Sequence, residues 1–130
     1  MNSAEVILDA SAILAVINGE KGADKLPPEL LAQAAVSTVN LAEVQSKLVA
    51  RGWDVNEAWE DCTSIVDEII PFSNEQAKNA GSLISATKSF GLSLGDRACL
   101  ALAIEKNAAI YTADRSWKNL KLPIAIHIIR

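Results

Sequence analysis

Four acidic residues stand where their carboxylates could form one chemical site. Asp9 and Asp114 come just after predicted strands, and Glu43 and Asp96 lie in the predicted first turns of helices. Carboxylate oxygens are the hard ligands that Mg²⁺ and Mn²⁺ prefer, and these ions take phosphate oxygens as further ligands. A site of this kind could activate a water molecule and stabilise the charge that develops during phosphodiester cleavage.

Each of these acids also fits a helix-capping role that needs no ligand. Residues 40–43 and 93–96 both have the spacing of a capping box. Asp9 and Asp114 are suited to N-cap positions, and a helix dipole favours acids in a first turn. Taken together, however, carboxylates that meet at one place repel each other and raise each other's pKa. Few basic residues stand in the same turns, so a divalent cation is the simplest way to offset the repulsion.

The elements that must position the acids alternate between strands and helices. Short apolar runs predict strands at residues 6–8, 35–38, 69–72, 109–112 and 124–129. Helical spacing and stop signals predict helices at residues 10–17, 29–34, 41–50, 56–68, 74–90 and 94–106. Pro71 indicates that its strand lies at an edge or ends there. This order predicts an α/β fold, a three-layer α/β/α sandwich around a short, mainly parallel five-stranded sheet.

A parallel sheet would gather most of the candidate acids. All strands end at the same edge of such a sheet, and ligands bind there. Topology alone therefore brings Asp9, Glu43 and Asp114 to one edge. Asp96 begins an apolar helix whose start the pattern does not place.

Length and composition indicate one globular domain that covers residues 1–130. The longest apolar run, at residues 98–104, is shorter than the roughly 20 residues of a membrane-spanning helix. The first residues lack the pattern of a signal peptide, and the two cysteines lack the spacing of a metal site. We therefore expect a cytoplasmic protein that is not bound to a membrane.

The charge balance limits the classes of function that this chain could have. Twelve basic against sixteen acidic residues give a net charge of −4, which excludes a protein that holds nucleic acid mainly by a broad basic surface. Chemistry on nucleic acid stays possible where acids hold cations. The mean hydropathy of +0.19 is high for a small monomer and predicts apolar surface that a partner covers.

Four segments make the sequence recognisable: residues 7–12, 37–44, 92–103 and 111–117. In their order and spacing the chain resembles the PIN-domain family, and within it the toxin ribonucleases of VapBC-type toxin–antitoxin modules. The resemblance implies an endoribonuclease, a hydrolase that uses Mg²⁺ or Mn²⁺ to cut RNA. It also implies a homodimer and a cognate antitoxin protein, whose groove we expect along the helices of residues 10–60.

The resemblance assigns roles position by position. Asp9, Glu43, Asp96 and Asp114 match the family's acids, which are its catalytic and metal-binding residues. The metal-activated water would attack the scissile phosphate and leave a 5′-phosphate and a 3′-hydroxyl. Asp114 would complete the site or orient the water, and it is the most variable of the four positions.

Other residues match supporting positions. Ser11 and Thr112 correspond to hydroxyl residues beside the metal and the last acid, and Asn40 to a polar residue near Glu43. The supporting arginines that could contact flanking phosphates are Arg97 and Arg115, although both also suit surface charge at a helix end.

Rival sites are poorly supported. His127 alternates with isoleucines in a strand, so it is not a general base, and Cys62 and Cys99 fit core positions. A receiver-like domain would need a lysine after the last strand, which is absent. The tryptophans could stack on bases, but core or dimer packing is the interpretation we favour. The alternative that stays open is a non-catalytic PIN-like binding or scaffold protein whose acids merely cap helices.

Overall fold

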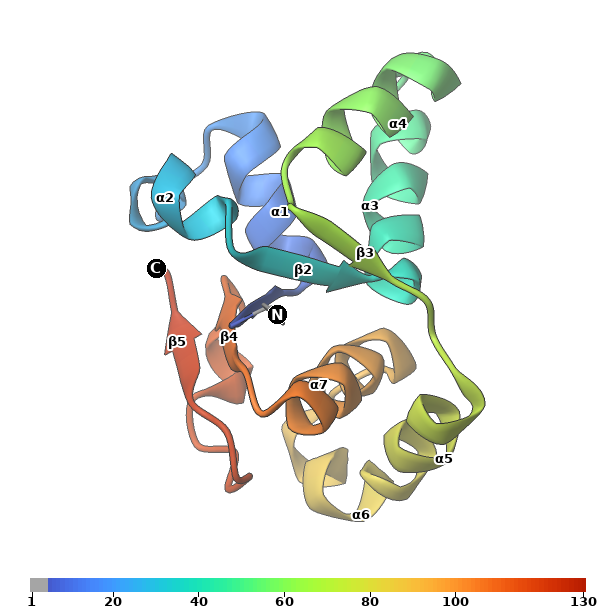
Figure 1. The fold of residues 1–130 in the computed structure, drawn as a ribbon, viewed down its shortest axis with the longest axis vertical. Helices are drawn as coiled ribbons and strands as arrows, with labels where there is room; N and C mark the ends of the chain where they lie inside the picture. The colour runs from blue at the N-terminus through green and yellow to red at the C-terminus, as the bar shows by residue number, and fades with distance from the viewer. Residues whose placement is uncertain (1–4) are drawn as a thin grey trace.

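A parallel five-stranded sheet lies between two layers of helices in the computed structural model, which describes residues 5–130 (Figure 1). Its strands are β1 (Val6–Leu8), β2 (Ala34–Ser37), β3 (Glu68–Ile70), β4 (Ala109–Thr112) and β5 (Ile126–Ile128). The order across the sheet is β3-β2-β1-β4-β5, and every neighbouring pair is parallel. The predicted three-layer α/β/α fold is confirmed, and β3, which Pro71 follows, is an edge strand.

The helices divide between the two faces of the sheet. They are α1 (Ala10–Asn18), α2 (Pro28–Leu31), α3 (Thr38–Ala50), α4 (Val55–Ser64), α5 (Asn74–Ser82), α6 (Ile84–Thr87) and α7 (Leu94–Lys106). Three 3₁₀ turns are η1 (Ala23–Lys25), η2 (Lys88–Phe90) and η3 (Arg115–Trp117). In Figure 1, α1 to α4 lie on one side of the sheet and α5 to α7 on the other.

Alternating side chains of the central strand supply two separate cores. Leu8 packs with the helices of the first layer, whereas its neighbour Ile7 packs with Leu100 and Leu102 of α7. Because both faces of β1 are covered, the strand is apolar at every position. This burial fixes the end of β1, and therefore Asp9, at the centre of the sheet edge.

Two helices, α3 and α4, have boundaries that differ from the sequence prediction. The helix expected over residues 41–50 begins at Thr38, because the Ser37 hydroxyl accepts a hydrogen bond from the Val39 N–H and forms the N-cap. The helix expected over residues 56–68 ends at Ser64, whose hydroxyl donates to the Asp61 carbonyl.

The long helix expected over residues 74–90 is wrong, because the chain forms α5, α6 and η2 there instead. The Ser82 hydroxyl donates to the Lys78 carbonyl, and the Thr87 hydroxyl donates to the Leu83 carbonyl. Such side-chain bonds compete with regular helical bonding. The hydrophobic periodicity of the sequence does not show where such side-chain hydrogen bonds interrupt a helix.

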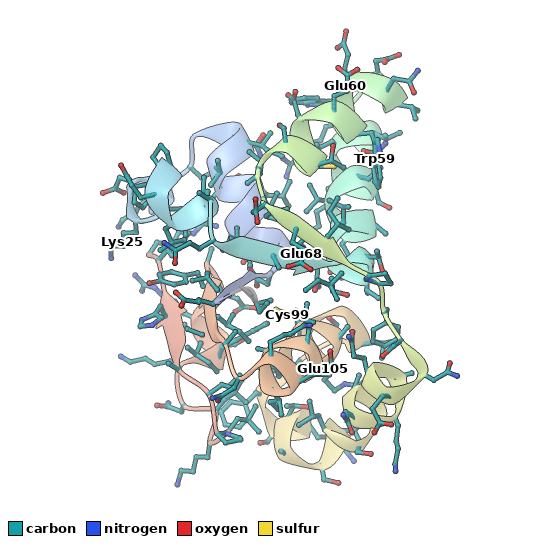
Figure 2. The ribbon with its side chains drawn as sticks, in the orientation of Figure 1. Lys25, Trp59, Glu60, Glu68, Cys99 and Glu105 are labelled. Carbon is teal, nitrogen blue, oxygen red and sulfur yellow. The ribbon has the colours of Figure 1, made fainter. Side chains whose placement is uncertain are left out.

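Several single-residue predictions are confirmed. Cys62 and Cys99 are buried, and Figure 2 shows Cys99 on α7 beneath the sheet. His127 lies in β5 with its ring stacked on Tyr111 at 4.6 Å between centroids. The expected packing of the tryptophans in a core is confirmed for Trp117, which is fully buried, whereas Trp59 is 47% exposed.

Among residues 5–130, no helix is long and apolar enough to cross a membrane.

Candidate active site

Asp9 occupies the carboxyl end of the central strand and caps the helix that follows. Its Oδ1 accepts a 2.9 Å hydrogen bond from the Ala12 N–H at the start of α1. The side chain is only 4% exposed. The short step from β1 into α1 therefore fixes this carboxylate inside the sheet edge rather than in solvent.

Two hydroxyl groups tie Asp9 to the end of β4. The Ser11 hydroxyl donates to Asp9 Oδ1 at 2.8 Å, and the Thr112 hydroxyl donates to Oδ2 at 2.6 Å. Each hydroxyl is itself held by backbone, since the Ala113 N–H donates to Ser11 Oγ and the Asp114 N–H to Thr112 Oγ1. The predicted supporting residues of this half of the site do surround Asp9.

Burial leaves Asp9 in an unfavourable electrostatic position. Desolvation raises the pKa of Asp9 to about 6, against the hydrogen bonds from Thr112, Ala12 and Ser11, and the Asp96 carboxylate adds to the rise. In the described part of the chain the one salt bridge joins Arg130 to Glu20, so no side-chain cation pairs with Asp9. At neutral pH the site holds a largely ionised, buried and uncompensated carboxylate.

Glu43 enters the site from the second turn of α3, held by Asn40. The buried Asn40 Nδ2 donates to Glu43 Oε1 and to the Gly95 carbonyl, both at 2.9 Å. The predicted capping box over residues 40–43 is wrong, because α3 begins at Thr38 and its N-cap is Ser37. Asn40 instead joins α3 to the start of α7, and its own Oδ1 is buried without a hydrogen-bond partner among residues 5–130.

Gly95 gives the Glu43 carboxylate its place. A Cβ added at Gly95 would lie 2.6 Å from the carboxyl carbon of Glu43, a distance that real Cβ contacts do not show. Only a residue without a side chain leaves room for this carboxylate against the first turn of α7. Gly95 was not among the residues predicted from the sequence, because a glycine inside a helical pattern weakens the helix but does not indicate what packs against it.

Asp96 forms the predicted capping box and also belongs to the site. Its Oδ2 accepts from the Ser93 N–H at 2.9 Å, and its N–H donates to the Ser93 hydroxyl at 3.1 Å. Its charge contributes to the raised pKa of Asp9. The position of the α7 start, which the pattern left open, is thus at the same edge as Asp9.

The thiol of Cys99 lies within the electrostatic influence of three of the acids. Burial raises the pKa of Cys99 well above its usual value, and the carboxylates of Asp9, Asp96 and Glu43 all raise it further. Cys99 is therefore a neutral core thiol and not a nucleophile. The charges of Asp9, Asp96 and Glu43 therefore all act on the same buried thiol of α7.

Asp114 is held by its own turn. Its Oδ1 accepts from the Ser116 N–H at 2.9 Å and from the Ser116 hydroxyl at 2.7 Å, which caps η3. Its main chain contacts Thr112, so it borders the site. Glu43 lies against Gly95, next to Asp96, and the Asp96 charge acts on Asp9. The carboxylate of Asp114 is instead engaged with its own turn.

The donor set fits a hard divalent cation in kind. It offers the carboxylate oxygens, including those of the buried Asp9, and the side-chain oxygen Oδ1 of Asn40, which has no partner in the described part of the chain. Within residues 5–130, however, no three acidic, histidine or cysteine side chains form a group that is ready to hold a metal ion. The carboxylates are held by caps and hydrogen bonds instead of forming a closed cluster.

The two candidate arginines make hydrogen bonds to backbone. Arg97 Nη1 donates to the Ala80 carbonyl of α5 at 3.0 Å, and Arg115 Nε donates to the Arg130 carbonyl at 2.9 Å. Arg97 therefore ties α7 to α5. Arg115 lies at the carboxyl edge, next to Asp114.

Comparison with known proteins gives a consistent result. The family model described as PIN domain matches residues 6–122. Among solved structures, VapBC2 from Rickettsia felis, bound to a DNA fragment of its promoter, has a TM-score of 0.72 at 24% identity, over 96% of this chain and 98% of that one. VapC20 from Mycobacterium tuberculosis, a toxin that cleaves the sarcin-ricin loop, has a TM-score of 0.70 at 17% identity, over 87% and 92%. No curated protein sequence matches the chain.

Proposed function

Because the chain belongs to the PIN-domain family, we propose that it is a divalent-metal-dependent endoribonuclease of the VapC toxin type. The observation that carries this proposal is the placement of three acids at the carboxyl edge of a parallel sheet: Asp9 at the end of β1, Glu43 against Gly95, and Asp96 in the first turn of α7. Carboxylates without paired cations at a ligand-binding edge are typical of a metal site for phosphate chemistry.

The proposed metal ligands are Asp9, Glu43 and Asp96, with Mg²⁺ or Mn²⁺ as the ion. When bound, such an ion lowers the pKa of a water molecule and neutralises charge on the phosphate that is attacked. Asp114 would orient the attacking water from the border of the site.

The chain's own residues prepare the ligands. Ser11 and Thr112 donate to Asp9 and favour its ionised form despite burial, because hydrogen bonds to a carboxylate lower its pKa. Asn40 holds Glu43 against Gly95, which restricts the carboxylate before any ligand arrives. These contacts orient the acids.

The proposed partners are RNA, a second copy of the chain and an antitoxin protein. The structural neighbours from Klebsiella pneumoniae and Mycobacterium tuberculosis are described as toxin–antitoxin proteins. On this chain, Val55 and Trp59 of α4 are 57% and 47% exposed. Such apolar residues suit a protein partner on the first helical layer. Light scattering at high concentration tests the dimer, and a chain that stays monomeric contradicts it.

A cleavage assay tests the activity. Purified chain is incubated with total RNA and Mg²⁺ or Mn²⁺, and the products are mapped. We expect cleavage that stops with EDTA and in both Asp9→Asn and Asp96→Asn. Asp61→Asn is the matched control, because Asp61 is exposed on α4. Full activity in both site variants, or in EDTA, contradicts the proposal.

The second candidate is a non-catalytic PIN-like binding or scaffold protein. It is favoured by one observation, namely that Asp9, Asp96 and Asp114 all accept capping hydrogen bonds. A thermal-shift titration with Mn²⁺ separates the two candidates. A metal site stabilises the folded chain by mass action, and this gain should be lost in Asp9→Asn.

A further inference from the structure

A basic pocket lies at the same sheet edge as the acids. Its volume is about 330 Å³, and it is lined by Arg115, Lys118, Ile128 and Arg130. Three of the chain's twelve basic residues line this pocket, and none of the residues that the structure shows lining it is acidic. In a chain with a net charge of −4, this concentration of positive charge requires a local explanation.

The backbone register connects this pocket to the acidic site. Ile128 of β5 pairs with Thr112 of β4, and the Ile129 N–H donates to the Thr112 carbonyl at 2.9 Å. Thr112 in turn donates to Asp9 at the end of β1. Since β1, β4 and β5 are consecutive in the sheet, the pocket lies about two strand spacings, roughly 10 Å, from Asp9.

The pocket has donors available for an anion. Arg115 uses Nε for the Arg130 carbonyl, and among residues 5–130 its two terminal nitrogens make no hydrogen bond. Lys118 is exposed, and its ammonium group has no partner in the same part of the chain. Arg130 is paired with Glu20 at 2.9 Å. One of the three charges is therefore offset, and two remain for a ligand.

We propose that this pocket binds a backbone phosphate of the RNA strand that is cut, close to the scissile bond. The inference rests on the proposed ribonuclease function and adds a phosphate subsite to it. The guanidinium of Arg115 presents a planar fork that matches phosphate oxygens, and Lys118 adds a point charge. The acidic site attracts the negatively charged RNA poorly. The basic pocket therefore supplies the electrostatic attraction and fixes the position of the RNA strand.

Binding of single-stranded RNA tests the subsite in an Asp9→Asn background, in which the RNA stays uncut. Fluorescence anisotropy measures the Kd of a labelled oligoribonucleotide over a range of KCl concentrations. The site variants are Lys118→Glu and Arg115→Gln. The matched control is Lys78→Glu, which makes the same charge change at an exposed position of α5 in the other part of the fold. Circular dichroism confirms that each variant is folded.

We expect Lys118→Glu to weaken RNA binding roughly tenfold and to reduce the salt slope by about 0.7, the value for one phosphate contact in a single strand. Arg115→Gln should weaken binding in the same direction, and Lys78→Glu should have little effect. Equal losses in Lys118→Glu and Lys78→Glu would show a general charge effect and overturn the subsite.

Other outcomes separate the subsite from the activity. RNA that binds and is cleaved unchanged when Lys118 and Arg115 are replaced overturns the subsite and leaves the ribonuclease proposal intact. A chain that neither binds nor cleaves RNA overturns both. If the two variants lose only the binding of an acidic antitoxin peptide, the pocket belongs to the protein partner and the RNA assignment is wrong.

Discussion

Thr112 Oγ1 donates a 2.6 Å hydrogen bond to Asp9 Oδ2 and so joins the ends of β4 and β1, although 103 residues separate them in sequence. The same hydroxyl accepts from the Asp114 N–H. The bond lowers the pKa of Asp9, whereas burial raises it. One side chain therefore links the buried carboxylate to the turn that carries the fourth candidate acid.

Replacing Thr112 with valine should cost both stability and activity. The variant keeps the side-chain shape but removes a hydrogen bond to a charged group, which corresponds to about 1.5–3 kcal/mol. It should also raise the pKa of Asp9 further, so that Asp9 is protonated in a larger fraction of the molecules at neutral pH. Urea unfolding and the pH profile of RNA cleavage measure the two effects.

Thr63→Val is the control for this substitution. The Thr63 hydroxyl donates to the Trp59 carbonyl within α4, away from the acids. Its replacement should leave the cleavage profile unchanged. A Thr112→Val profile that matches that of the parent would show that the hydrogen bond does not act on Asp9.

The stability of the metal-free chain should fall as the pH rises through the titration range of Asp9. In the unfolded chain Asp9 has a pKa near 3.8, and in the folded chain about 6, so the folded chain binds more protons between these values. This difference corresponds to about 3 kcal/mol of stability, present below pH 3.8 and lost above about pH 6. Asp9→Asn should flatten this part of the curve, whereas Asp61→Asn should not. Urea unfolding in EDTA at several pH values measures it, and identical slopes in both variants would show that Asp9 is not the group responsible.

Adding one methyl group at Gly95 should disable the site without removing any acid. The new Cβ would collide with the Glu43 carboxyl group, so Glu43 must leave its position beside Asn40. Gly81→Ala is the matched control, because Gly81 also lies in a helix and its Cβ would meet no atom within 4 Å. The control should be slightly more stable, by roughly 0.5–1 kcal/mol, with unchanged cleavage. Normal cleavage by Gly95→Ala would show that the position of Glu43 is not critical.

The sequence predicts the sheet and the edge positions because both follow from short-range patterns. Strands β1 and β4 are apolar runs with sharp ends, and Asp9 must therefore emerge at the end of β1. The capping box of Ser93 and Asp96 is equally local, since both residues lie in one turn. These features need no knowledge of distant contacts.

Contacts between distant segments account for what the sequence could not show. Asn40 and Gly95 are in contact although 55 residues separate them in sequence, and neither residue type indicates this contact. The basic pocket likewise joins Arg115 and Lys118 after β4 with Arg130 after β5. Such groups become visible only when the register of neighbouring strands is known, because a pattern along the chain does not record which ends lie side by side.

Asp114 should prove to be a structural cap more than a metal ligand. Its Oδ1 accepts two hydrogen bonds from Ser116, so Asp114→Ala should destabilise the chain by about 1 kcal/mol through loss of the cap. Asp114→Asn keeps an acceptor oxygen and removes only the charge, so it should unfold near the parent's midpoint. If Asp9, Glu43 and Asp96 hold the metal, a rise in Tm with Mn²⁺ persists in Asp114→Asn and disappears in Asp9→Asn. A thermal-shift titration of the two asparagine variants measures this difference. Loss of the Mn²⁺ response in Asp114→Asn would make Asp114 a ligand, and its bonds to Ser116 would then have to break when the ion binds.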